Sequence, residues 1–424
     1  MNRMPRRLLW GVLPVLVVGG ALAVTGVPGS SAPESDAGRL ERLSEALETY
    51  VEEGRLAGAV ALVAHDGETS YLEAVGDRDI EAGDPMETDD IFRIASQTKA
   101  IVSVAVMMLQ EAGELLISDP VGRYLPEYME TTVAVPDGDG GYEVVPANRP
   151  ITIRDLLTHT AGIGYGGGPA ADLWAAADIQ GWYFAHRDEP IRETVRRMAA
   201  LPMDAQPGER FVYGYATDIL GALVEEVSGE PLDAFMRSRI FEPLGMADTH
   251  FYLPEEKRDR LSVVYSASAD GLAPAPDPGG MVGQGAYVDG PRTSFSGGAG
   301  LLSTAYDYAR FLQMMLNGGE LDGARILSSK SVQLMTVNHL GDRYNWGGGV
   351  GFGLGFSVLA DLGARGTPGS VGEYGWGGAY HSTYWVDPAE DLVVVYFTQL
   401  IPTGGVDDHA KLRTLVYQAI DELQ

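Results

Sequence analysis

The hydrophobic and polar positions near the start of the chain predict a helix followed by a hairpin. The helix is expected over residues 39–53. Residues 59–64 then form an uninterrupted apolar run, the turn Asp66-Gly67 follows, and residues 70–75 resume a strand pattern. Two such runs joined by Asp-Gly are typical of a β-hairpin.

The last part of the chain shows the same two kinds of element. Residues 383–386 and 392–398 flank the turn Asp387-Pro388 and predict a second pair of strands, and residues 408–423 predict a terminal helix. Helix and strands therefore occur at both ends of the chain, around a long middle rich in helix and loop. This order predicts an α+β fold in which the two ends build one antiparallel sheet flanked by helices.

The middle of the chain is expected to form a second, mainly helical domain. The α/β part would take about residues 38–118 and 331–424, and the helical and loop-rich part about residues 119–330. We interpret residues 32–424 as a single functional domain built from these two parts, because no internal repeat or long linker divides them.

Residues 1–31 predict a signal peptide and hence export, to the periplasm or the medium. Three arginines precede an apolar run over residues 8–24, and Ala21-Leu22-Ala23 and Ser30-Ser31-Ala32 are competing cleavage patterns. The alternative is an uncleaved membrane anchor, because a run of 17 residues is at the lower limit for crossing a bilayer. Without this segment we expect no stable membrane insertion.

Composition removes several classes of function. The chain has 59 acidic and 30 basic residues, a net charge of −29, which argues against nucleic acid or an anionic membrane surface as the main partner. It has no cysteine, so disulfides, thiolate metal sites and a cysteine nucleophile are excluded. A small molecule is therefore the expected partner.

The search for catalytic motifs leaves one candidate, Ser96 and Lys99 in the spacing Ser-x-x-Lys. The motifs GxSxG, HExxH and a glycine-rich loop ending in Gly-Lys-Ser/Thr are all absent. By itself Ser-x-x-Lys is weak, because four lysines give it by chance in about one chain in four. Its context is stronger, since apolar residues recur at helical spacing from Ile101 to Leu109 and predict a buried helix that stops at Gly113.

Ser96 is thus expected in the first turn of a buried helix, with Lys99 on the same face. A helix N-terminus stabilises negative charge, and an apolar surround disfavours the charged form of an amine. A neutral Lys99 could then accept the Ser96 proton and make the serine a nucleophile. In the alternative interpretation, Ser96 only caps the helix and Lys99 is a solvated residue of its first turn.

From about residue 38 to the C-terminus, the chain resembles the serine β-lactamase and penicillin-binding-protein-like family, especially its class C-related esterase branch. The order of the matching segments is far more specific than any one of them. These segments are Phe92–Lys99, Asp119–Glu127, Ile151–Gly162, Pro207–Tyr213, Ala216–Gly221, Phe241–Met246, Gly298–Asn317 and Trp376–Pro388.

The resemblance implies a role for three residues. Ser96 matches the acylated nucleophile, Lys99 the activating lysine, and Tyr213 the tyrosine of the Tyr-x-Asn motif, a general acid/base. Whether Lys99 or Tyr213 takes the proton stays open, and Tyr213 is alternatively an ordinary half-buried aromatic residue. For His159 we expect a structural, hydrogen-bonding role. The family requires no metal or cofactor for this chemistry.

Two departures from the family pattern bear on the substrate. Tyr215 stands where penicillin-recognising members have the asparagine that contacts a substrate amide. Trp376, Gly377 and Gly378 stand where they have Lys or His, then Thr or Ser, then Gly. Because tryptophan cannot pair with a carboxylate, the departures favour neutral esters.

The residues after Trp376 are candidates for the rest of the substrate site. A backbone N–H near Gly378 and Ala379, with that of Ser96, would form an oxyanion hole. Tyr380 and His381 are expected to line the pocket, although His381 is alternatively a surface loop residue.

The sequence therefore predicts an exported serine hydrolase that forms an acyl-enzyme on Ser96 and acts as a carboxylesterase on neutral esters. One alternative is a β-lactamase or a D-alanyl-D-alanine peptidase (penicillin-binding protein), and another is a catalytically inactive binding protein on the same scaffold. The expected partner is a small ester or amide, without nucleic acid, metal or cofactor.

Overall fold

The computed structural model describes residues 36–344 and 346–420, which belong to one compact unit beginning at Asp36. The expected signal peptide over residues 1–31 lies outside the described residues. Among the helices of the described ranges, none combines the length and apolar character that crossing a bilayer requires.

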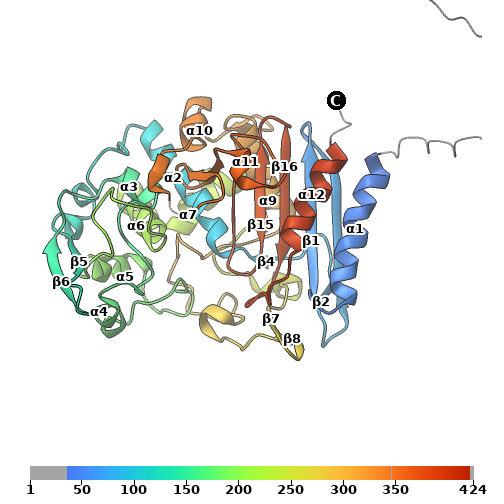
Figure 1. The fold of residues 1–424 in the computed structure, drawn as a ribbon, viewed down its shortest axis with the longest axis horizontal. Helices are drawn as coiled ribbons and strands as arrows, with labels where there is room; N and C mark the ends of the chain where they lie inside the picture. Colours follow the sequence, from blue (N-terminus) through green and yellow to red (C-terminus); the bar gives the residue numbers. More distant parts are fainter. Residues whose placement is uncertain (1–35, 345, 421–424) are drawn as a thin grey trace, which may run out of the picture. The chain divides into compact units, whose positions relative to one another are not determined.

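One antiparallel sheet of eight strands joins the two ends of the chain, as predicted (Figure 1). Its contact between the ends is the pairing of β1 with β16, in the register Val60↔Phe397 to Ala64↔Val393. In spatial order the strands are β12 (Val350–Phe352), β13 (Ser357–Leu359), β14 (Tyr374–Gly377), β15 (Thr383–Asp387), β16 (Leu392–Thr398), β1 (Gly58–His65), β2 (Glu68–Asp79) and β3 (Asp84–Pro85).

Strand β1 is apolar from Ala59 to Ala64 because both faces of the sheet are covered. Ala61 and Val63 point to the layer formed by α1 (Asp36–Glu52) and α12 (Asp408–Ile420), which lie side by side along the sheet in Figure 1. Val60 and Leu62 point to the opposite side, into the larger core that contains α2 (Thr98–Glu111) and α9 (Ala305–Leu316). The period of two along a strand thus assigns each residue to one of two cores.

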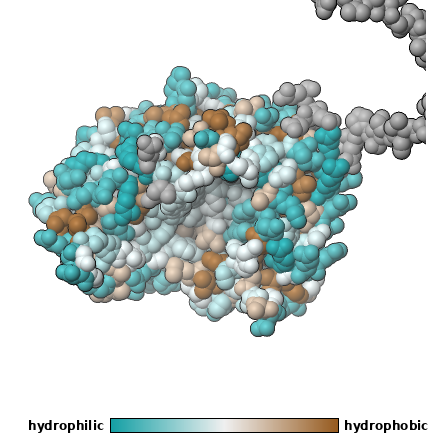
Figure 2. All heavy atoms as spheres, viewed as in Figure 1, coloured by the Kyte–Doolittle hydropathy of each residue, from teal (hydrophilic) through white to brown (hydrophobic). Residues whose placement is uncertain are grey.

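The remaining elements lie mainly between residues 95 and 350, and many of them are on the side of the sheet away from α1 and α12 (Figure 1). The remaining α-helices are α2 (Thr98–Glu111), α3 (Ile153–Leu157), α4 (Ala171–Ala176), α5 (Ile191–Met198), α6 (Ala216–Ser228), α7 (Leu232–Met236), α8 (Glu242–Leu244), α9 (Ala305–Leu316), α10 (Ser329–Met335) and α11 (Leu362–Arg365). The short 3₁₀ turns are η1 (Ala95–Gln97), η2 (Val121–Arg123), η3 (Pro126–Tyr128), η5 (Glu255–Arg260), η6 (Gly280–Val282) and η7 (Gly341–Arg343), and η4 (Arg237–Phe241) is a π-turn. Four small strand pairs complete the fold: β4 (Phe92–Arg93) with β9 (Leu302–Ser303), β5 (Thr132–Pro136) with β6 (Tyr142–Pro146), β7 (Tyr265–Ser268) with β8 (Gly271–Pro274), and β10 (Glu320–Leu321) with β11 (Ala324–Arg325). Hydrophilic residues cover much of the face in Figure 2, which is hollowed near its centre.

Ser96 lies just before the α-helix, whereas the sequence predicts it in the first turn of that helix. It belongs to the 3₁₀ turn η1, and the α-helix begins only at Thr98. Ala95, with a φ of +43°, cannot continue an α-helix, so the helical backbone starts after it, first as this 3₁₀ turn. Helix α2 itself is buried on nearly all sides and is followed by Gly113 at φ +77°, as expected.

Helix α9 begins with a buried carboxylate that the fold keeps hard to ionise. Thr304 caps the helix, and Asp307 accepts hydrogen bonds from the Asp248 backbone N–H at 2.7 Å and the Thr249 hydroxyl at 3.0 Å. Burial outweighs these bonds and raises the pKa of Asp307 to about 6. The folded protein thus holds this proton more tightly than the unfolded chain does, so stability is lost as the pH rises from about 4 to about 6.

We therefore expect the substitution D307N to change the pH dependence of stability. Asparagine keeps an acceptor for Asp248 and Thr249 but cannot ionise. Relative to wild type, the free energy of unfolding of D307N should rise by up to about 3 kcal/mol between pH ~4 and pH ~7. Urea unfolding followed by tryptophan fluorescence measures this difference. A difference that is the same at both pH values would contradict the assignment.

Candidate active site

The side chain of Lys99 is buried, only 2% exposed, and its amine faces three oxygen atoms. Its Nζ lies 2.7 Å from the Gly298 carbonyl oxygen, 3.0 Å from Tyr165 Oη and 3.3 Å from Ser96 Oγ. Within the described ranges Lys99 forms no ion pair with a carboxylate. Ser96 is partly exposed, so the structure brings together an accessible hydroxyl and a buried amine.

Ser96 does not act as a helix cap. The first helical turn of α2 has no side-chain cap, and Ser96 Oγ is within hydrogen-bond distance of the Lys99 amine instead. The solvated Lys99 of the alternative interpretation is likewise excluded by its burial. A hydroxyl beside an amine in this geometry is the arrangement that nucleophilic catalysis needs.

Tyr213 lies against the same amine. The Lys99 Nζ is 4.7 Å from the centroid of the Tyr213 ring, within the range of a cation–π contact. The phenolic oxygen of Tyr213 accepts a hydrogen bond from Trp376 Nε1 at 2.9 Å. Trp376 thus orients Tyr213, and the three residues Ser96, Lys99 and Tyr213 form one group.

Tyr165 also contacts the Lys99 amine, although no motif in the sequence singled out this residue. It lies in the glycine-rich segment 162–168, which resembles a flexible loop in the sequence. Burial raises the pKa of Tyr165 well above its usual range, a shift that the neighbouring Ser96 hydroxyl partly offsets. Tyr165 therefore keeps its proton at neutral pH.

Asp218, on α6, supports the loop that accepts a hydrogen bond from Lys99. Its buried carboxylate accepts hydrogen bonds from Ser296 Oγ at 2.6 Å and from the Gly298 N–H at 3.1 Å. The pKa of Asp218 is raised by burial, although the Ser296 hydroxyl and the Lys99 charge act to lower it. An acidic residue directly before the apolar stretch 219–224 was the signal in the sequence.

The turn between β14 and β15 lies beside the segment that carries Ser96. A Cβ atom added to Gly378 would lie 2.6 Å from the Ile94 carbonyl oxygen, so the two backbones are in close contact. Ala379 packs in one apolar cluster with Ala95. The structure therefore brings the Gly377-Gly378-Ala379 backbone to the start of η1.

Three residues expected to contact substrate lie elsewhere. Tyr215 is fully buried and stacks on Trp174 behind Tyr165. Tyr380 is fully buried against Trp182. His381 turns toward α12, where its ring bonds to Asp408. These side chains therefore do not line the pocket as expected. The two tyrosines are packed in the core, and His381 is hydrogen-bonded to Asp408.

His159 is structural, but its contacts differ from those expected. Its pKa lies well below the usual range because of burial and the nearby Lys99 charge, so the ring is neutral. Among the described residues its Nδ1 has no hydrogen-bond partner, and the centroid of its ring lies 4.7 Å from that of Tyr213 and 5.5 Å from that of Phe352. His159 therefore fixes the back of the Tyr213 ring.

An exposed indole extends this aromatic wall to the surface. Trp346 is 54% exposed and stacks on Trp376 with 5.8 Å between ring centroids. It also contacts Tyr213 edge to face at 5.6 Å. No motif pointed to Trp346, which precedes the glycine run 347–349.

Comparison with known proteins finds one family and close relatives. Residues 43–418 match the Beta-lactamase family. The chain is 37% identical to esterase EstB of Burkholderia gladioli over 378 residues, covering 86% of this chain and 91% of EstB. It is 32% identical to the lovastatin esterase of Penicillium rubens over 304 residues, covering 69% and 71% of the two chains. The structure of EstCE1, a hydrolase with promiscuous acyltransferase activity, matches with a TM-score of 0.78 and 29% identity, over 90% of this chain and 99% of that one.

The close contact at Gly378 gives a test of the site's geometry. In G378A the new Cβ would collide with the Ile94 carbonyl and the Ser382 side chain, so we expect a loss of about 1–3 kcal/mol in the free energy of unfolding. The matched control is G377A, whose Cβ meets only the Ser382 carbonyl, at 3.0 Å, and whose loss should be smaller. Urea unfolding of both variants decides this, and equal losses would refute the described contact.

Proposed function

The chain belongs to the beta-lactamase family, and from that premise we propose that it is a serine hydrolase which forms an acyl-enzyme on Ser96. The observation that carries the proposal is the buried Lys99 amine at 3.3 Å from Ser96 Oγ, with Tyr213 against it. A catalytically inactive binding protein would have no need to keep an amine out of water beside an accessible hydroxyl.

In the proposed reaction, Ser96 Oγ attacks the carbonyl carbon of an ester while its proton passes to Lys99 or Tyr213. The backbone N–H groups of Ser96 and Ala379 would hold the negative oxygen of the tetrahedral intermediate. The intermediate collapses to an acyl-enzyme and an alcohol, which takes up the proton. Because Trp376 donates to Tyr213 Oη, the phenol's own O–H stays free to give that proton. Water then hydrolyses the acyl-enzyme.

We further propose that the substrates are neutral carboxylic esters. The Lys99 amine faces three protein oxygens, so it is poorly placed to pair with a substrate carboxylate. Trp376, at the position where penicillin-recognising relatives carry a basic residue, directs its N–H to Tyr213 instead. Two relatives are named as esterases, which agrees with this substrate class.

Export by a signal peptide over residues 1–31 completes the proposal. It rests on the sequence pattern of three arginines, an apolar run and small residues. Expression of the full chain followed by N-terminal sequencing of the released protein tests it, and a retained N-terminus would contradict it.

Removal of the nucleophile is the first test of function. S96A should abolish the hydrolysis of p-nitrophenyl butyrate and the labelling of the protein by a fluorescent fluorophosphonate, because it removes the hydroxyl that is proposed to carry the acyl group. Turnover at the wild-type rate would refute the proposal. Labelling of the wild type by a fluorescent penicillin, with slow turnover of esters, would support a penicillin-recognising enzyme instead.

Substrate charge is the second test. The wild type should hydrolyse a neutral p-nitrophenyl ester with a kcat/KM at least about 10-fold above that of an otherwise similar ester with a carboxylate in its acyl chain. W376K should narrow this ratio by supplying a cation, whereas the control W376F should not. An equal kcat/KM for the two esters in the wild type would contradict the proposed substrate class.

A further inference from the structure

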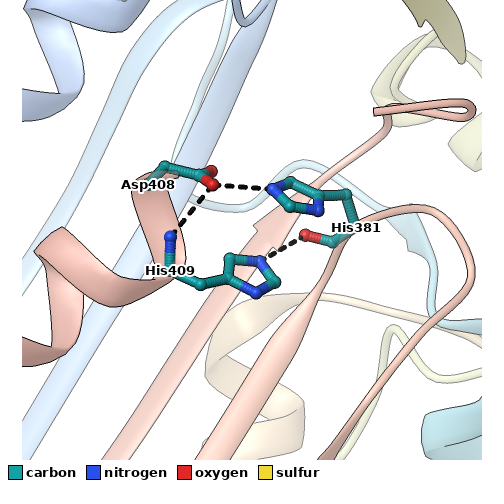
Figure 3. Close-up of side chains that lie close together, drawn as sticks. All are labelled: His381, Asp408 and His409. Atoms are coloured by element: carbon teal, nitrogen blue, oxygen red, sulfur yellow. Dashed lines mark hydrogen bonds and ion pairs between the residues drawn. The ribbon is translucent and has the colours of Figure 1, made fainter. Parts of the chain in front are cut away.

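The turn that would carry the oxyanion hole is attached to the C-terminal helix by a small polar cluster (Figure 3). The His381 ring donates from Nε2 to the Asp408 carboxylate at 2.7 Å. The His409 ring donates from Nε2 to the His381 carbonyl oxygen at 3.0 Å. The first turn of α12 therefore binds both the side chain and the backbone of His381.

The acceptor in this cluster is fixed from several directions. Asp408 is fully buried and also accepts hydrogen bonds from the His409 backbone N–H at 2.9 Å and from Tyr396 Oη at 2.7 Å. Burial acts to raise the pKa of Asp408, but the hydrogen bond from His381 and the other neighbouring donors outweigh it and lower that pKa. Asp408 is thus an ionised carboxylate at the N-terminus of α12, where the helix dipole also favours it.

His381 needs this support because of its backbone conformation. Its φ of +66° lies in the left-handed region, which is unfavourable for a residue with a side chain. Such a conformation persists where the surrounding contacts determine it, and it is often found at functional sites. Ala95, directly before Ser96, also has a positive φ, +43°. A residue with a positive φ therefore lies directly before Ser96 and another lies two positions after Ala379, the two proposed N–H donors.

His381 in turn determines the path of the residues before it. The His381 N–H donates to the Gly378 carbonyl at 3.2 Å, and the Gly378 N–H donates to the Ser382 carbonyl at 2.8 Å. Ala379 lies inside this loop of hydrogen bonds, and within the described part of the chain its own N–H donates to no backbone acceptor. The N–H of Ala379 is thus held in place yet left free.

The geometry of the cluster suits a hydrogen-bonded clamp better than a metal site. The three side chains offer donor atoms within 4.8 Å of one another. However, the His381 and His409 rings are stacked, with centroids 4.0 Å apart and an angle of 11° between their planes. A metal ion lies in the plane of each imidazole that binds it, and one ion cannot lie in two parallel planes.

We propose that Asp408 and His409 are positioning residues that clamp His381 and so hold the Ala379 N–H toward the oxygen of the substrate carbonyl. This inference rests on the proposed acyl transfer at Ser96. Neither residue touches the reacting atoms, so their effect should fall on the rate of acylation. The loss of one donor to a developing oxyanion typically costs about 10²–10³ in kcat, and a displaced donor should cost less.

The test compares H409A, H409Q and D407N with wild type. H409A removes the bond to the His381 carbonyl, and H409Q can restore an N–H donor at about the same reach. D407N is the matched control, because Asp407 is adjacent but binds Tyr50 at 3.0 Å and Arg55 at 2.9 Å instead of His381. His409 is used because it is partly exposed, so its variants should fold.

We expect H409A to lower kcat for p-nitrophenyl butyrate by about 10- to 100-fold, with KM changed by less than about 3-fold. Inhibition by an alkyl boronic acid, which forms a tetrahedral adduct on the serine, should weaken in proportion to kcat. H409Q should recover kcat to within about 3-fold of wild type, and D407N should keep it. A purely structural role would lower the melting temperature without this split between kcat and KM.

Several outcomes would overturn the proposal. These are an unchanged kcat in H409A, an H409Q as impaired as H409A, or a D407N with the same loss of kcat as H409A. S96A separates this failure from that of the proposed function. If S96A is inactive while H409A keeps its kcat, only the clamp is wrong, whereas an active S96A would overturn both.

Discussion

A lysine side chain removed from water has to find its hydrogen-bond acceptors inside the protein, and Lys99 finds three. The carbonyl of Gly298, the phenol of Tyr165 and the hydroxyl of Ser96 all lie within 3.3 Å of its amine. Each of these groups comes from a different part of the chain, so the fold has to be complete before the amine is satisfied. The chemistry proposed for Ser96 depends on this one constraint.

The surrounding structure can be understood as a set of supports for that amine. Asp218 holds the loop of Gly298, and His159 and Trp376 fix the ring of Tyr213. On the other side of Ser96, the close approach of Gly378 to Ile94 brings the turn after β14 to the proposed nucleophile. Most of these supports are hydrogen bonds or ring contacts between residues far apart in the sequence.

Local sequence patterns were enough to predict the two strand pairs that join the chain ends, whereas the proposal of Ser96 and Lys99 also needed the resemblance to a known family. Apolar runs at 59–64 and 392–397 predicted β1 and β16, because a strand covered on both faces is mostly apolar along its length. The Ser-x-x-Lys spacing gave Ser96 and Lys99, because both residues lie on one short segment. The α-helix begins at Thr98, later than predicted. The positive φ of Ala95 and the 3₁₀ turn after it cannot be read from residue propensities.

Residues that act through long-range contacts escaped prediction. Tyr165 was hidden in a glycine-rich segment, and only folding brings its hydroxyl to Lys99. Tyr215 and Tyr380 were assigned to the pocket from their neighbours in the sequence, whereas the core buries them completely. The environment of a side chain is set by elements that the local sequence does not contain.

The most direct test of the central claim is the rate at which Ser96 is acylated when Lys99 can no longer exchange a proton. Wild type and K99M, which has a similar shape but no amine, are mixed briefly with a p-nitrophenyl ester and quenched with acid. Mass spectrometry of the peptide that contains Ser96 then measures the acyl adduct. We predict an adduct in wild type and none in K99M on the same timescale. Equal acylation of the two proteins would contradict the account.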